Sequence, residues 1–355
     1  MEEKFGQDDF FVYKFPQPQY LGAKQKHLKW MEQFFPKEVV TVLDPFSGSQ
    51  SVAFFLKQLG KKVITNDFLE FNNQIGKALV ENRSVKLSDE DVELIFSDNS
   101  DPKYYNLFEE TFSNLFYSVE DCKIIDAARS NIEKLDGYKK NLAFAIMNRT
   151  LTRKVTMGHF GHTVALKYAS DPLRVKRNRS LVRPIKDIFL DLLPLYNNAV
   201  FDNNQENKSF CEGAIELIKK TKDVDLLYLD PPYCCSHADY QSFYHLLETF
   251  TNYWKDKEFI NSTKMYFPKR KSGFDIKKEA INSFEKLFSN SASIPFWVIS
   301  YNNRSYPKQE ELVKLISKYK NVEVFKKKYE NNVGGKGSVK NSYELLFFCT
   351  PKKEK

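Results

Sequence analysis

The sequence predicts an α/β fold with a mixed sheet and a mostly helical inserted domain. The apolar, β-branched run Val39–Leu43, a following helix and a second strand at Lys62–Thr65 together form a βαβ unit. Helical spacing dominates over Ser84–Asn204, and strand character returns at Val224. Two strand-like runs near the end of the chain indicate an antiparallel hairpin, so the sheet should be mixed rather than wholly parallel.

Composition limits the class of protein. The 355-residue chain is long enough for two domains, or for one large domain with an insertion, and its 15% of aromatic residues supplies a sizeable core. The first residues lack the basic and apolar regions of a signal peptide, and no apolar run approaches membrane-spanning length. The cysteines are odd in number and lack CxxC spacing, so neither disulfides nor a structural zinc site is expected. A cytoplasmic location is therefore expected. The cysteines are Cys122, Cys211, Cys234, Cys235 and Cys349.

The first strand runs directly into a turn of mostly small residues, Asp44-Pro45-Phe46-Ser47-Gly48-Ser49-Gln50-Ser51, and the second strand ends in Asn66-Asp67. Such a turn lets a ligand approach the backbone N–H groups at a helix start, and an acid after the second strand can accept bonds from both hydroxyls of a ribose. Neither GxGxxG nor GxxxxGK[ST] occurs, so a nucleoside without a pyrophosphate fits this turn better. The alternative is an ordinary tight turn with a surface Asp67.

A helix is predicted on each side of this strand. The segment Tyr20-Leu21-Gly22-Ala23-Lys24 precedes a helix over His27–Phe35, which Pro36 ends. The helix after the turn includes Val52 and Leu59, and Gly60 occupies the position that a helix C-cap prefers.

Positive charge is concentrated in the predicted insertion. The net charge is +8, and the window from Arg149 to Lys186 holds ten Lys and Arg residues against the single acid Asp171, which gives +9 there and −1 elsewhere. A segregated basic block fits a polyanion, with a solvated basic face as the alternative. We therefore expect DNA-binding residues within it: Lys167, Arg174, Lys176, Arg177, Arg179 and Arg183. The nearby His159 and His162 lack a third ligand at suitable spacing, so no metal is expected.

The strongest local signal is the apolar run Val224–Leu229, which stops abruptly at Asp230-Pro231-Pro232-Tyr233. Proline cannot donate to a ladder, so the strand must end there and leave Asp230 at a carboxyl-terminal sheet edge. The Asp230 carboxylate and the Pro231 carbonyl can accept the two N–H bonds of an exocyclic amine, while Tyr233 stacks on its ring. A polar turn after a buried strand is the alternative interpretation. We assign the neighbouring Cys234-Cys235 pair to packing.

The remaining strands follow this turn. Phe296–Ile299 is a further buried strand and leads into Ser300-Tyr301-Asn302-Asn303. A helix over Glu310–Tyr319 separates it from the predicted closing hairpin. That hairpin consists of Val322–Phe325 and Glu344–Phe348, joined by the segment that contains Gly334-Gly335-Lys336-Gly337.

These motifs, in this order, resemble those of the Dam-like class of adenine-N6 DNA methyltransferases. Asp230-Pro231-Pro232-Tyr233 matches the catalytic motif of that class in full, and Ser300-Tyr301-Asn302-Asn303 resembles a downstream strand-end motif. Gly22 and Lys24 resemble its Gly-Gly-Lys stretch. The resemblance covers residues 20–82 and 205–350 and implies these cofactor-binding residues: Tyr20, Gly22, Lys24, Asp44, Pro45, Phe46, Gly48, Asp67 and Glu212.

The resemblance implies a Rossmann-like methyltransferase domain over residues 1–82 and 205–355, with an inserted target-recognition domain over residues 83–204. It also implies site-specific methyl transfer from S-adenosyl-L-methionine to N6 of adenine in double-stranded DNA, without a metal, with base flipping and with a separate cognate restriction endonuclease as a possible partner. Two positions depart from the family pattern. Gln50 stands where the family turn usually has a second glycine, and Glu212 is shifted from the usual adenine-binding acid.

Three other functions stay open from the sequence. A cytosine-N4 DNA methyltransferase and an adenine-N6 RNA methyltransferase share the chemistry, although by family habit serine in place of Asp230 would favour cytosine and asparagine would favour RNA or protein targets. A catalytically silent DNA-binding protein belongs to another class of function. The presence together of Asp67, Asp230 and Tyr233 argues against silence.

Overall fold

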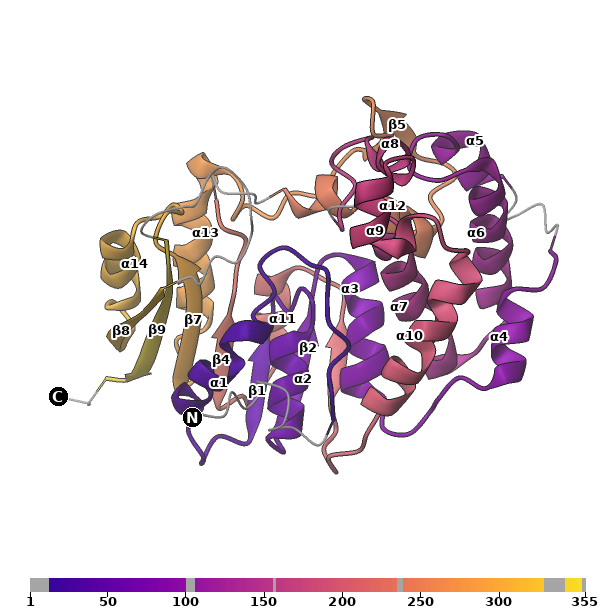
Figure 1. The fold of residues 1–355 in the computed structure, drawn as a ribbon. Coiled ribbons are helices and arrows are strands. Elements are labelled where there is room, and N and C mark those ends of the chain that lie inside the picture. The colour runs from indigo at the N-terminus through magenta and orange to yellow at the C-terminus, as the bar shows by residue number, and fades with distance from the viewer. Residues whose placement is uncertain (1–12, 100–105, 156–157, 235–238, 329–341, 353–355) are drawn as a thin grey trace, which may run out of the picture.

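A seven-stranded mixed sheet forms one half of the molecule, and a group of helices forms the other (Figure 1). The computed structural model describes residues 13–99, 106–155, 158–234, 239–328 and 342–352. The strand order is β3-β2-β1-β4-β7-β9-β8. Strand β9 runs antiparallel to both of its neighbours, while the pairs from β3 to β7 are parallel. The prediction of a mixed sheet is confirmed.

The strands lie close to the predicted runs. The sheet consists of β1 (Thr41–Asp44), β2 (Lys62–Asn66), β3 (Lys208–Phe210), β4 (Leu226–Leu229), β7 (Phe296–Asn302), β8 (Lys320–Lys328) and β9 (Tyr343–Pro351). The predicted closing hairpin corresponds to β8 and β9, and its glycine-rich connection lies outside the described residues. A separate two-stranded hairpin, β5 (Glu258–Ile260) with β6 (Met265–Phe267), was not predicted.

Successive residues of each central strand face two different cores, as the two-residue period of a strand requires. In β1, Val42 belongs to one apolar cluster and Leu43 to the other. In β4, Leu226 and Tyr228 belong to the same cluster as Val42, whereas Leu227 and Leu229 belong to the same cluster as Leu43. Both faces of the sheet are therefore covered, which explains why the strands are apolar without alternation.

One set of helices covers each face. The Val42 face packs against α1 (Leu28–Met31), the 3₁₀ turn η2 (Glu32–Phe34), α2 (Ser51–Gln58) and the π-helical segment η3 (Gly76–Glu81). The Leu43 face packs against α11 (Ala214–Lys220), α13 (Lys277–Asn290) and α14 (Gln309–Ile316). Gly60 follows α2 with a φ of +76°, in agreement with its predicted role at the helix end.

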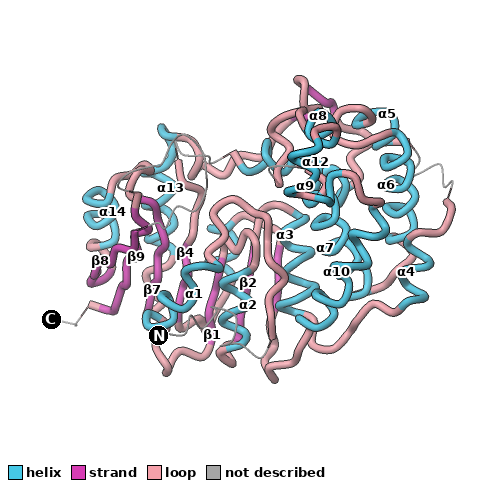
Figure 2. The backbone as a smooth tube through the Cα atoms, viewed as in Figure 1, coloured by secondary structure: helices cyan, strands magenta, loops and turns pink. Residues whose placement is uncertain are grey.

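The other half is helical, as the sequence predicts for the insertion (Figure 2). It contains α4 (Asp89–Ile95), α5 (Leu107–Phe112), α6 (Val119–Ile132), α7 (Gly137–Arg153), α8 (Ala165–Ala169), α9 (Pro172–Arg177), η4 (Arg179–Leu181) and α10 (Ile185–Ala199). Its core also takes in Phe71 and neighbouring residues around α3 (Glu70–Ile75), and Tyr244 to Tyr253 around α12 (Tyr240–Asn252). No helix in the described part of the chain is both long and apolar enough to cross a membrane.

Buried polar contacts fix α12 between the two halves. The Arg129 guanidinium donates to the carbonyls of Phe250 and Thr251, at 2.7 and 3.0 Å, which ties α6 to the end of α12. The Glu248 carboxylate accepts bonds from the backbone N–H groups of Glu70 and Phe71 at the start of α3, at 3.0 and 3.1 Å. Because α12 begins at Tyr240, these contacts also determine where that side chain lies.

Candidate active site

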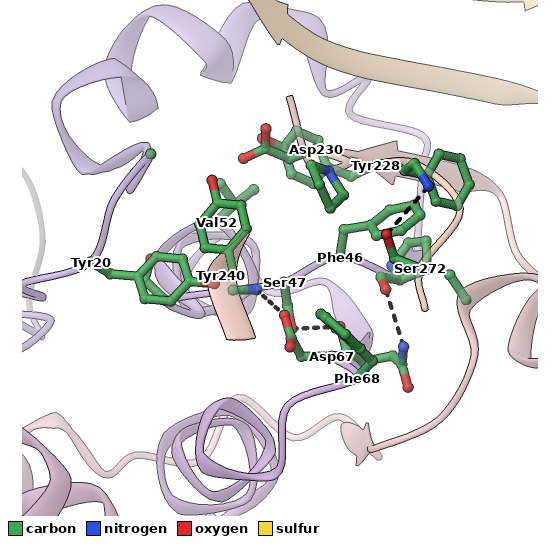
Figure 3. Close-up of a pocket in the computed structure, with 18 of the residues that line it drawn as sticks. Tyr20, Phe46, Ser47, Val52, Asp67, Phe68, Tyr228, Asp230, Tyr240 and Ser272 are labelled. Carbon is green, nitrogen blue, oxygen red and sulfur yellow. Dashed lines mark hydrogen bonds between the residues drawn. The ribbon is translucent and has the colours of Figure 1, made fainter. Parts of the chain in front are cut away.

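The candidate site lies where the strand order reverses. From β1 the chain continues outwards to β2 and β3, whereas β4, on the other side of β1, leads to β7. Open α/β sheets bind ligands at the carboxyl ends of the strands at such a point. A pocket opens there and is lined by the turn after β1, by Asp67 after β2, by Asp230 and Pro232 after β4, and by Tyr20 and Tyr240 (Figure 3).

The turn after β1 brings the backbone close to this pocket. Gly48 has a φ of +47°, and a Cβ atom added to it would lie 3.0 Å from the Tyr20 ring, so the turn needs glycine here. The Gly48 N–H donates to Asp67 Oδ2 at 2.9 Å, and the Leu69 N–H donates to Asp67 Oδ1 at 2.9 Å. Two backbone donors therefore orient the carboxylate. Burial raises the pKa of Asp67 to about 6, and hydrogen bonds from Leu69, Asn72 and Gly48 oppose that shift.

Gln50 is turned into the protein interior. It has a left-handed φ of +66° and is fully buried. Its amide donates to Ser47 Oγ at 2.7 Å and to the Asn72 carbonyl at 3.2 Å, and its Oε1 accepts a bond from Thr65 Oγ1 at 2.7 Å. The side chain supports the turn from behind and does not line the pocket, so the missing second glycine leaves the pocket open.

The rings of Tyr20 and Tyr240 form one wall of the pocket, and Tyr244 supports Tyr20 from outside it. The Tyr20 ring stacks on Tyr240 with 5.5 Å between ring centroids and on Tyr244 with 4.8 Å, and the Leu21 N–H donates to the Tyr244 hydroxyl at 2.8 Å. Tyr20 was predicted from the resemblance, but Tyr240 was not assigned to the site. It enters the pocket because α12 starts beside the turn that contains Gly22, where the Tyr240 hydroxyl lies 3.2 Å from the position of a Gly22 Cβ atom.

Asp230 is held by two side chains. Lys24 Nζ lies 2.7 Å from Asp230 Oδ2, and the Tyr233 hydroxyl lies 2.9 Å from Asp230 Oδ1. Lys24 also donates to the Gly22 carbonyl at 2.9 Å. Burial raises the pKa of Asp230 to about 6; the Lys24 charge opposes this shift, and the negative charge of Glu344 adds to it. The carboxylate is thus oriented, while its side chain keeps 19% exposure to the pocket.

Tyr233 does not line the pocket in this structure. It is buried, its ring meets Tyr301 edge-on at 5.2 Å, and its hydroxyl lies 3.0 Å from Glu344 Oε1 as well as close to Asp230. Pro231 is buried, whereas Pro232 contributes to the pocket wall. Cys234 is buried against the Asp275 carbonyl, as expected for a packing role, and Cys235 lies outside the described residues.

Two predicted cofactor residues, Asp44 and Glu212, are not freely available to a ligand. Asp44 is fully buried behind the pocket, where its Oδ1 accepts a bond from the Phe46 N–H at 3.3 Å. Burial, together with the charge of Asp230, raises the pKa of Asp44 well above its ordinary range. Glu212 does line the pocket, but its carboxylate lies 2.5 Å from Lys220 Nζ. Pro45 and Phe46 line the pocket as predicted.

Glu344, on β9, is the member of this cluster that sequence reasoning missed. It is only 1% exposed, and Ser300 Oγ, the Tyr233 hydroxyl and Lys24 Nζ all lie close to its Oε1. The available signal was an acid at the head of the otherwise apolar run Glu344–Phe348. Acidic residues are common at the exposed ends of strands, so the position of Glu344 in the sequence did not indicate that it lies beside Asp230.

Comparison with known proteins agrees with this geometry. The sequence profile of the D12 class of N6 adenine-specific DNA methyltransferases matches residues 20–304. The chain belongs to this family. Family membership decides for adenine N6 in DNA over cytosine N4, RNA adenine and a silent DNA-binding protein, and it implies S-adenosylmethionine as the methyl donor. The chain is an adenine-specific DNA methyltransferase with the expected Rossmann-like fold.

Three relatives are methyltransferases of type II or modification methylases. The chain is 33% identical to type II methyltransferase M2.HphI of Haemophilus parahaemolyticus, over 94% of this chain and 97% of that protein. It is 28% identical to modification methylase StsI of Streptococcus sanguinis and 24% identical to type II methyltransferase M.FokI of Planomicrobium okeanokoites. In the last two comparisons, it spans about half of the relative, 52% in each case.

Some basic residues of the block Arg149–Lys186 are bonded to other residues of the protein, and others are exposed. Arg149 donates to the Gln17 carbonyl and to Gln19, and the buried Lys154 ammonium lies 2.8 Å from Asp121. Arg174 lies 3.4 Å from Asp171, and Arg183 is paired with Asp191. Within the described residues, no ion pair involves the other four predicted DNA-binding residues, which are exposed: Lys167, Lys176, Arg177 and Arg179.

The segment around His159 and Phe160, within this block, packs against α12 next to the pocket wall. The Phe160 N–H donates to the Phe243 carbonyl at 2.7 Å, and the His159 ring lies 5.0 Å from the Phe243 ring, one turn of α12 beyond Tyr240. Figure 1 places α8, α9 and α12 together at the top right of the molecule. The described residues contain no group of three His, Cys, Asp or Glu side chains able to hold a metal ion.

The first prediction concerns pH. If Asp230 accepts the target amine, it must be ionised. Its pKa is raised to about 6, so activity should be fully present above that pH and fall as the pH drops through it. Below it, the single-turnover rate at saturating S-adenosylmethionine should fall about tenfold per pH unit. Rapid-quench measurements between about pH 7 and about pH 5 test this, and a flat profile contradicts it.

The second prediction concerns the cofactor. Asp67→Asn should weaken S-adenosylmethionine binding by roughly 10- to 100-fold, because charge-assisted hydrogen bonds are worth about 1.5–3 kcal/mol each. Isothermal titration calorimetry gives the dissociation constant directly. The same substitution at Asp89, an exposed residue of α4, is the control and should leave binding unchanged. Equal affinities for the two variants would show that Asp67 has no part in binding.

Proposed function

We propose that the chain methylates a specific site in double-stranded DNA by holding a flipped adenine at Asp230 beside S-adenosylmethionine. The observation that carries this proposal is that one pocket is lined by Gly48 after β1, by Asp67 after β2, and by Asp230 and Pro232 after β4. At one end, Gly48 lets a ligand approach the backbone, and the Asp67 carboxylate can bind ribose hydroxyls. At the other end, the Asp230 carboxylate can accept a hydrogen bond from an exocyclic amine. Both requirements of the reaction meet in one cavity.

The residues of the pocket fit the methyl donor. The Asp67 carboxylate can bind the ribose hydroxyls, Phe46 offers an apolar surface, and Gly48 permits close approach to the turn. The remaining contacts would come from the other expected residues that line the pocket, which are Tyr20, Gly22, Lys24, Pro45 and Glu212. Asp44 lies behind the pocket and would act only through the turn that it supports. When bound, S-adenosylmethionine supplies a methyl group on a sulfonium, which is already an electrophile. No metal is required for this chemistry.

The protein's own contribution is alignment. The adenine amine is a poor nucleophile, because its lone pair is delocalised into the ring. The Asp230 carboxylate and the Pro231 carbonyl, as paired acceptors, orient the amine so that its lone pair faces the methyl group, and catalysis comes mainly from positioning and electrostatics. Tyr233 stacks on the flipped base in this proposal, which requires its ring to leave the buried position that it has here.

DNA contacts are assigned to the helical domain, residues 83–204, through the exposed residues of the basic block that follow the His159–Phe160 segment packed on α12. Exposed arginines suit bidentate contacts to guanine edges and phosphates. The names of the three relatives support a further proposal, that this enzyme is the modification component of a type II restriction-modification system with a separate endonuclease.

The proposed role of Asp230 gives a direct test. Asp230→Ala should nearly abolish transfer of labelled methyl groups to DNA while leaving S-adenosylmethionine affinity almost unchanged, since Asp230 serves the target amine. Mapping of the methylated positions in DNA treated with the unmodified enzyme identifies the recognition site. Near-normal turnover by Asp230→Ala would overturn the assignment of this turn as catalytic.

The division of the basic block gives a second test. Arg177→Ala should weaken DNA binding because its guanidinium is exposed, whereas Arg183→Ala should have a smaller effect because Arg183 is engaged with Asp191 and with the Asp187 carbonyl. For a phosphate contact, the slope of log affinity against log salt should flatten by about one unit. For a base contact, preference at one position of the site should relax instead. Equal effects of the two variants would contradict this division.

A further inference from the structure

Glu344 lies beside Asp230 but outside the residues that the family profile matches, which end at residue 304. Its Oε1 lies 3.0 Å from the Tyr233 hydroxyl and 3.7 Å from Lys24 Nζ, and it accepts a bond from Ser300 Oγ. A buried carboxylate is costly unless it is paired, so its place in this cluster calls for a function.

The charges of the cluster do not cancel. Lys24 and Asp230, 2.7 Å apart, form a neutral pair, and Glu344 adds one further negative charge. Burial would lower the pKa of Lys24, but Asp230 and Glu344 raise it, so Lys24 is a cation. Burial raises the pKa of Asp44 well above its ordinary range, which disfavours its charged form.

The other titratable groups facing the cluster do not change this balance. Burial lowers the pKa of His27, which is therefore neutral near pH 7, and burial raises the pKa values of the Tyr228 and Tyr240 phenols. Lys327 pairs with Glu344 in the register of β8 and β9, and its ammonium lies over the Trp30 ring, 5.6 Å from the centroid. The cluster around Asp230 thus carries a net negative charge.

We propose that Glu344 is a positioning residue that offsets the Lys24 charge and so keeps the surroundings of Asp230 negative during methylation. Methylation forms a C–N bond while the C–S bond breaks, so the positive charge moves from sulfur to the target nitrogen, which then loses one proton to water. A negative environment on the nitrogen side stabilises that charge where it develops. Without Glu344, Lys24 would neutralise Asp230 and this stabilisation would weaken. The inference rests on the role proposed for Asp230.

Two substitutions separate charge from shape. Glu344→Gln keeps the size and one acceptor oxygen but removes the charge, whereas Glu344→Asp keeps the charge and shortens the side chain. The single-turnover rate of Glu344→Gln on the high-pH plateau should fall on the order of 10- to 100-fold, and Glu344→Asp should retain more activity than Glu344→Gln. If only shape or hydrogen bonding mattered, the order of the two variants would be reversed, and that result would overturn the inference.

The pH profile supplies a readout that a purely structural role would not move. The Glu344 charge raises the pKa of Asp230, so the acid limb of the Glu344→Gln profile should shift to lower pH even as its plateau falls. Glu344→Asp should keep the limb of the unmodified enzyme. An unshifted limb in a folded Glu344→Gln variant overturns the inference. A shifted limb in Glu344→Asp does the same, and this variant alone suffices for the test if Glu344→Gln does not fold.

Controls isolate this effect from loss of fold or of binding. Thermal unfolding and the dissociation constant for S-adenosylmethionine should be nearly unchanged in the Glu344 variants. Glu323→Gln, the same change at an exposed position of β8, should match the unmodified enzyme. An inactive Asp230→Ala variant beside a normal Glu344→Gln variant refutes only the inference about Glu344, whereas an active Asp230→Ala variant refutes the proposed role of Asp230 itself.

Discussion

The early end of β4 determines the arrangement of the whole site. Pro231 and Pro232 cannot extend the ladder, so β4 stops at Leu229 next to β1, and the following turn bends over the point where the strand order reverses. The turn after β1, which ends at the start of α2, lies on the other side of the same gap. Two turns that are far apart in sequence thereby line one pocket.

The two ends of this pocket are built in different ways. At the Asp67 end, backbone N–H groups of Gly48 and Leu69 fix the carboxylate, so its position follows from the fold alone. At the Asp230 end, the partners are the side chains of Lys24 and Tyr233, which have rotatable bonds and can be exchanged for a substrate. On the proposed function, a rigid end for the cofactor and an adjustable end for the base suit a substrate that leaves the DNA helix before it binds.

Sequence reasoning located pocket residues whose position depends on their chain neighbours, and it missed those whose position depends on packing. Gly48, Asp67 and Asp230 line the pocket as expected because a turn and a strand end can be recognised from a few consecutive residues. Glu344 could not be predicted, because the register of β9 on β7, with Leu346 opposite Ser300, brings it to Asp230. Charge counting likewise located the basic block, but it could not reveal that the Lys154 ammonium is buried against Asp121.

The helix α12 links the helical half of the molecule to the pocket on the sheet. It follows the turn that begins at Asp230 in sequence, yet Tyr244 and Phe250 belong to the core of the helical half, and Arg129 binds its final turn. Its first residue, Tyr240, lines the pocket and stacks on Tyr20. Phe243 of α12 contacts the segment before α8 through the Phe160 N–H and the His159 ring. The helix α12 therefore connects the proposed DNA surface to the pocket wall at Tyr240.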